Sequence, residues 1–132
     1  MRLAVAVAAA SIALIAPGDR ASATYAAGTL SLALHYEMVC GQPGRGPVVV
    51  DLPGAFRVAS RPRVDVRGAL RPASSSAGTV TILLPKPPFV TCMSITEGTL
   101  RITIAGVRAP VGTYTVRASI GTHDFAAPIR VR

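Results

Sequence analysis

The stretch TLSLALHYEMVC, residues 29–40, decides the fold class of this chain. Apolar side chains occupy every second position in it: Leu30, Leu32, Leu34, Tyr36 and Met38. Small, polar or charged residues hold most of the positions between them. A period of two is the spacing of a β-strand that buries one face. We therefore expect a strand here, with Cys40 on the same inward side as the leucines.

The same alternation returns along the rest of the chain. It occupies residues 48–52, 56–58, 64–66, 79–84, 100–104, 114–120 and 125–131. Glycine and proline separate these segments, and residues 71–78 (RPASSSAG) have the composition of a turn or loop. Seven to nine short strands with this punctuation predict an all-β chain, folded as an antiparallel β-sandwich. A small open barrel is the alternative.

The first 23 residues have the layout of a signal peptide. An arginine precedes an apolar run over residues 3–16, and Pro17-Gly18 interrupts that run. Residues 21–23 (ASA) offer small side chains at both positions of a cleavage site. We expect a signal peptide over residues 1–23 and one domain over residues 24–132, secreted or associated with the cell surface. The run is shorter than the roughly 20 residues of a bilayer span, which favours a removed leader. No second apolar run could span a membrane, so we expect no transmembrane span in the mature chain. A retained membrane anchor is the alternative.

The chain has two cysteines, Cys40 and Cys92. In an exported chain a single pair of cysteines is most simply joined, and Cys92 shares the inward parity of Val90. On the chain-entropy estimate, closing so long a loop stabilises the fold by about 4 kcal/mol. The alternatives are a metal–thiolate site and an intermolecular bridge. Neither a C-x-x-C motif nor clustered histidines accompany the cysteines, and no histidine lies near Cys92 as a cupredoxin copper site requires. We expect no metal and no cofactor.

The segment APVGTYTVRASIGTHDFAAPIRVR, residues 109–132, resembles the last two strands of bacterial immunoglobulin-like domains. The resemblance implies that Tyr114 occupies a tyrosine corner, with its hydroxyl bonded to the backbone a few residues upstream. The chain departs from the antibody pattern, because Val116 stands where that pattern has a cysteine and there is no tryptophan.

Longer stretches extend this resemblance. CGQPGRGPVVVDLPGAFRV (residues 40–58) and GTLRITIAGV (residues 98–107) are similar to secreted immunoglobulin-like proteins of GC-rich bacteria and to surface-layer-type modules. Of the 14 basic residues only Lys86 is a lysine, a bias typical of GC-rich genomes. The resemblance implies an immunoglobulin-like sandwich and carries no activity with it.

Few residues could support catalysis. His35 and Glu37 share one face of the first strand, and His123-Asp124 falls in a predicted hairpin turn. Ser74 to Ser76 lack the Gly-x-Ser-x-Gly surroundings of a hydrolase nucleophile. We therefore expect that the chain is not an enzyme. A small hydrolase or a metal carrier is the weakest of the alternatives.

The formal net charge is +8. Five arginines lie within 15 residues and form a candidate anion-binding site: Arg57, Arg61, Arg63, Arg67 and Arg71. Further arginines face outward from later strands: Arg101, Arg117, Arg130 and Arg132. Such a positive field attracts polyanions, although an arginine-rich soluble surface is the simpler interpretation. The few aromatics have mostly core parity, which argues against nucleic acid as a partner.

Two functional hypotheses follow. The first is a secreted, non-catalytic structural or binding module of the bacterial cell exterior, tied by one disulfide, with another surface protein as a possible partner. The second is an electrostatic binder of anionic cell-envelope polymers.

Overall fold

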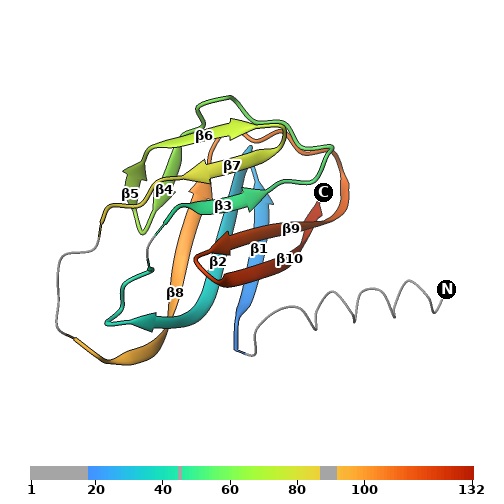
Figure 1. Ribbon diagram of the computed structural model, residues 1–132. Coiled ribbons are helices and arrows are strands. Elements are labelled where there is room, and N and C mark those ends of the chain that lie inside the picture. Colours follow the sequence, from blue (N-terminus) through green and yellow to red (C-terminus); the bar gives the residue numbers. More distant parts are fainter. Residues whose placement is uncertain (1–17, 45, 87–91) are drawn as a thin grey trace, which may run out of the picture.

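The chain folds as two antiparallel β-sheets packed against each other. The computed structural model describes residues 18–44, 46–86 and 92–132. Within this part of the chain there are ten strands and no helix (Figure 1). The predicted all-β fold class and the β-sandwich are therefore confirmed. None of the described residues belongs to a helix long and apolar enough to span a bilayer.

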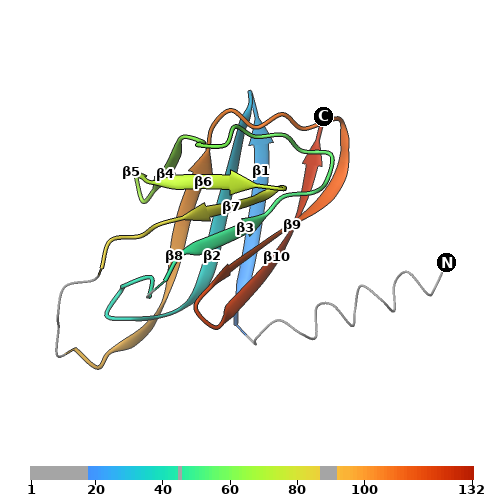
Figure 2. The same ribbon diagram turned by 45° about the horizontal axis from the view of Figure 1, so that its top comes forward.

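Each sheet contains five strands. The first sheet has the order β1-β2-β8-β4-β5, formed by β1 (Arg20–Ala26), β2 (Thr29–Val39), β8 (Ile95–Ile104), β4 (Val64–Val66) and β5 (Ala69–Arg71). The second sheet has the order β10-β9-β3-β7-β6, formed by β10 (His123–Val131), β9 (Gly112–Ile120), β3 (Val48–Asp51), β7 (Thr79–Ile82) and β6 (Ala73–Ser76). The strands of the second sheet cross in front of those of the first in Figure 2.

The core lies between the sheets and follows the alternation of the sequence. The inward side of β2 supplies five side chains that are at most 3% exposed: Leu30, Leu32, Leu34, Tyr36 and Met38. Val48, Val80, Ile82 and Ile120 of the second sheet belong to the same cluster. Burying one such aliphatic side chain stabilises a fold by about 1.5–3 kcal/mol, so this alternation is the main source of stability.

Residues 71–78 differ from the expectation of a turn or loop. They contribute the end of β5 and all of β6, which pairs with β7 from Ala73 opposite Ile82 to Ser76 opposite Thr79. Serine has little intrinsic preference for strands, but pairing with an adjacent strand overrides local propensity. The free edge of β6 is partly covered, because Ser75 donates from its N–H to Ser60 O at 2.8 Å and from its hydroxyl to Ala59 O at 2.7 Å.

The described residues form ten strands, where seven to nine were expected. Residues 56–58, expected as a strand, form only a single bridge between Arg57 and Arg108. Strands β5 and β1 are also unexpected, and β1 begins within the predicted signal peptide. It pairs along its whole length with β2, from Arg20 opposite His35 to Ala26 opposite Thr29.

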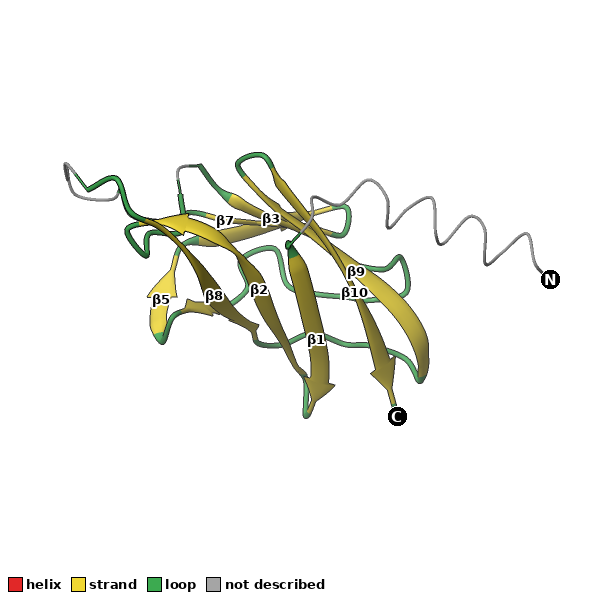
Figure 3. Ribbon diagram, turned by 90° about the horizontal axis from the view of Figure 1, so that it is seen from below, coloured by secondary structure: helices red, strands yellow, loops and turns green. Residues whose placement is uncertain are grey.

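The predicted cleavage site, residues 21–23, lies inside β1. A cut after Ala23 removes four of the seven residues of this strand. Strand β1 is an edge strand of the first sheet and runs beside β10, an edge strand of the second (Figure 3). The apolar run of the predicted leader lies outside the described residues.

Candidate functional site

The two cysteines form a disulfide, as predicted. Cys40 and Cys92 are joined, with 6.0 Å between their Cα atoms. Their expected inward orientation is wrong, because Cys40 is only half-buried and Cys92 is exposed. The backbone at Cys40 takes a left-handed conformation (φ 56°) directly after β2, which turns the chain out of the strand and breaks the alternation. The bond thus ties the end of β2 to the segment before β8, outside the core.

Tyr114 at the start of β9 makes the backbone contact that the resemblance implies. Its hydroxyl donates to Pro110 O at 3.0 Å, four residues upstream. Its ring meets that of Phe56 edge-on, with 4.9 Å between the centroids. A Cβ added at Gly112 would lie 3.0 Å from the Tyr114 hydroxyl, so glycine at this position leaves room for the contact. Tyr114 therefore anchors the loop before β9.

The predicted anion-binding arginines have different environments. Arg57 donates to Gly54 O at 2.6 Å and to Phe56 O at 2.9 Å. Arg67 follows β4 and donates to Gly41 O at 3.0 Å. Of the remaining three, Arg61 and Arg63 are exposed and Arg71 is half-buried at the end of β5. Although these arginines are close in sequence, they are spread over the loop before β4, the turn between β4 and β5, and β5 itself, and two of them use their donors on nearby carbonyls.

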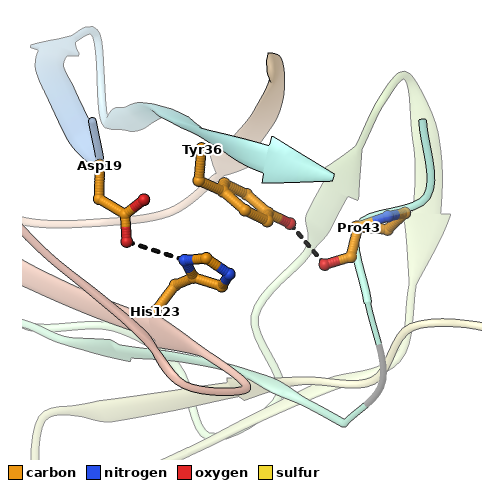
Figure 4. Close-up of polar contacts among 4 residues, drawn as sticks. All are labelled: Asp19, Tyr36, Pro43 and His123. Carbon is orange, nitrogen blue, oxygen red and sulfur yellow. Dashed lines mark hydrogen bonds and ion pairs between the residues drawn. The ribbon is translucent and has the colours of Figure 1, made fainter. Parts of the chain in front are cut away.

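His123 forms a contact that joins the two sheets. Its Nδ1 lies 2.8 Å from Asp19 Oδ2, and the Asp19 side chain is only 5% exposed (Figure 4). Asp19 precedes β1, whereas His123 begins β10. We call this pair the Asp19–His123 clasp. Sequence reasoning placed Asp19 in a removable leader and paired His123 with Asp124, so it missed the clasp.

Tyr36 packs beside the clasp. Its ring centroid lies 4.8 Å from that of His123, and its hydroxyl donates to Pro43 O at 2.6 Å (Figure 4). Burial, with a smaller contribution from the Asp19 carboxylate, raises the pKa of Tyr36 to about 12, although the Arg67 charge acts in the opposite direction. The hydroxyl is therefore a neutral structural donor at ordinary pH.

His35 belongs to the outer face of the first sheet. Its Nδ1 lies 3.0 Å from Thr99 Oγ1, and its Nε2 lies 3.7 Å from Glu97 Oε1. Glu37 lies opposite Glu97 on the neighbouring strand. Among the described residues, no group of three or more histidine, cysteine, aspartate or glutamate side chains is placed to hold a metal ion.

The same outer face is hollowed at its centre. Two adjoining depressions, each of about 300 Å³, share Ser22, Ala33 and Arg101. Arg20, His35 and Thr99 complete one of them, whereas Thr24, Ser31 and Thr103 contribute to the other. We call this hollow the Arg20–Arg101 trough. The sequence predicted that Arg101 on β8 faces outward, but it assigned Arg20 to the leader.

No significant match was found when the chain was compared with family models, with curated proteins and with solved structures.

Proposed function

We propose that this chain is an exported β-sandwich that acts outside the cytoplasm as a non-catalytic binding or structural module. The observation that carries the proposal is the Cys40–Cys92 bond. Disulfides persist in oxidising compartments and are rare in the reducing cytoplasm. The apolar run over residues 3–16 supports the same location, because it has the length of a signal-peptide core.

The position of β1 bears on where processing occurs. Cleavage after Ala23 would remove Asp19 and with it the partner of His123, and would leave the edge of β2 unpaired opposite residues 20–23. Ala16 and Gly18 also present small residues at the two positions that a signal peptidase reads. We therefore place the cut after Gly18, so that the mature chain begins at Asp19.

The strand order supports an immunoglobulin-like classification. In the constant-type immunoglobulin fold the sheets are A-B-E-D and G-F-C. Here β1-β2-β8-β4 and β10-β9-β3 have the same neighbours and the same central pairings. The bond from Tyr114 to Pro110 adds a tyrosine corner. The difference is the segment β5 to β7, which follows β4. It adds β5 beside β4 in the first sheet and β7 and β6 outside β3 in the second, before the chain returns to β8.

The contacts of the two histidines support a non-catalytic role. His35 bonds Thr99 across neighbouring strands, and His123 bonds Asp19 across the sheets. Each imidazole thus uses its Nδ1 in a contact that holds the fold together.

Cell fractionation combined with intact-mass measurement tests the proposal. We expect the full-length chain, expressed in a bacterial host, to appear outside the cytoplasm with a mass that begins at Asp19. Thiol labelling should find no free cysteine until a reductant is added, and two afterwards. Retention in the cytoplasm with two free thiols would contradict export, and a mass that begins at Thr24 would contradict the processing site.

A further inference from the structure

Among the residues that the structure describes, two arginines and no carboxylate line the Arg20–Arg101 trough, and carboxylates lie in the neighbouring rows of the sheet on either side of it. Arg20 lies beside His35 on β2, and one row further along the strands Arg101 lies beside Ala33. Glu37 and Glu97 occupy the row on one side of this centre. Asp65 lies on the other side, opposite Thr103. The two arginines therefore stand in the two middle rows of the face.

Both guanidinium groups are available for a ligand. Within the described residues neither Arg20 nor Arg101 forms an ion pair, and neither side chain donates a hydrogen bond to the protein. Both residues are exposed. This contrasts with Arg57 and Arg67, whose donors already bond backbone carbonyls. An arginine whose donors are free presents a planar fork that matches a carboxylate or phosphate.

The floor of the trough allows the two arginines to act on one ligand. Strand spacing and residue rise place the Cα atoms of Arg20 and Arg101 roughly 12 Å apart, diagonally across β2. Ala33 lies between them and has no side chain beyond Cβ, so it leaves space above the sheet. Hydroxyls of Ser22, Thr24 and Thr103 line the same hollow. Charge and hydroxyl groups thus alternate over a shallow groove.

We propose that the Arg20–Arg101 trough binds an acidic polysaccharide, with sugar carboxylates on the arginines and sugar hydroxyls on the serine and threonine side chains. This inference rests on the proposed location outside the cytoplasm, where such polymers are found, and on the proposed cut after Gly18, because a cut after Ala23 would remove Arg20 and Ser22. A linear polymer fits the trough because the trough extends across three strands, β1, β2 and β8, and is open to solvent. Nucleic acid fits less well, since the residues that line the trough include no aromatic side chain on which bases could stack.

Fluorescence anisotropy with labelled polygalacturonate tests the proposal on the purified chain with its disulfide formed. The key variant reverses both charges, Arg20→Glu with Arg101→Glu. The matched control is Arg117→Glu with Arg130→Glu on the outer face of the second sheet, which changes the net charge equally. We expect the trough variant to lower affinity by about tenfold or more, and the control by no more than about twofold. Raising NaCl from about 50 to about 500 mM should weaken wild-type binding strongly.

A second variant guards against misfolding. Ala33→Leu fills the floor of the trough without changing charge, and we expect a loss of affinity of about threefold or more with an unchanged circular dichroism spectrum. Equal loss in the trough variant and its charge-matched control would overturn the proposed site. Tight binding of a single-stranded oligonucleotide with none of polygalacturonate would overturn the ligand class. Neither result concerns export or the disulfide, which fractionation and thiol labelling test separately.

Discussion

The outer faces of the two sheets both carry arginine but differ in the residue that lies opposite it on the neighbouring strand. On the second sheet Arg117 lies directly opposite Asp51 on β3, and a carboxylate is thus its neighbour across the strand pair. On the first sheet Arg101 lies opposite Ala33, and its acidic neighbours lie further along the strands. The comparison shows that strand register decides what lies directly opposite an arginine: Arg117 has Asp51, whereas Arg101 has Ala33.

The largest effect should come from removing the disulfide. Substituting Cys40→Ala with Cys92→Ala releases the restraint on the unfolded chain, and we expect the free energy of unfolding to fall by about 4 kcal/mol. Urea denaturation of wild type and variant, with and without reductant, measures it. Because the bond lies away from both outer faces, binding by the folded fraction should be unchanged. A variant as stable as the wild type would show that the bond adds nothing to folding.

Alkaline pH tests the core without changing the arginines of the two outer faces, because arginine keeps its charge at pH values where a tyrosine hydroxyl ionises. The pKa of Tyr36 is raised to about 12 from 10.0. Between these values the Tyr36 hydroxyl loses its proton in the unfolded state but keeps it in the native state. The contribution of Tyr36 to the free energy of unfolding is therefore fully present below pH 10 and is lost as the pH rises toward 12. We expect a loss of about 2–3 kcal/mol by pH 12.

Thermal denaturation between pH 9 and 12 checks this slope. The control is Tyr36→Phe, which should lose this component of the slope because phenylalanine has no ionisable hydroxyl. An identical slope in both proteins would refute the assignment to Tyr36.

The Asp19–His123 clasp joins the residue before β1 to the first residue of β10. Asp19→Ala leaves His123 without its partner and should lower the free energy of unfolding by about 1–2 kcal/mol. Because Asp19 adjoins β1, hydrogen exchange should increase at the start of β1 and much less in β3. Asp19→Asn keeps an acceptor near His123 and should behave more like the wild type. Equal exchange in β1 of wild type and Asp19→Ala would contradict the role of the clasp.

The smallest predicted effect is a change in polygalacturonate affinity when the second face loses its carboxylate at Asp51. Asp51→Ala removes the carboxylate beside Arg117 and makes the second face more like the first. We expect affinity for polygalacturonate to rise by no more than about twofold, because the second face still lacks the Ala33 floor. The same anisotropy assay measures it. A rise as large as the loss in the trough variant would show that net charge, and not the trough, controls binding.

Much of the fold was predictable from residue order. The alternation in residues 29–40 predicted a strand with one buried face, and every apolar side chain expected inward from Leu30 to Met38 is buried. The single cysteine pair predicted the disulfide. These predictions succeeded because parity along a strand and the count of cysteines are local properties of the chain.

The failures have equally physical causes. Strand β1 was missed because residues 21–23 have the small side chains of a cleavage site, and in the fold residues 20–26 pair with β2. The serines of β6 have the composition of a loop, yet β7 supplies a partner strand. Composition describes what a segment can do in isolation, and it does not include the neighbour that the fold provides.

The sequence by itself determined which residues of β2 turn inward from Leu30 to Met38, that the chain forms β-sheets, and which two sulfur atoms are joined. Only the tertiary structure decided that Arg20 and Arg101 face one hollow, that Asp19 meets His123, and that Arg57 and Arg67 use their donors on backbone carbonyls. The reason is that alternation selects a face of a strand but contains no information about the adjacent strand. That choice is made by the register of strands distant in sequence.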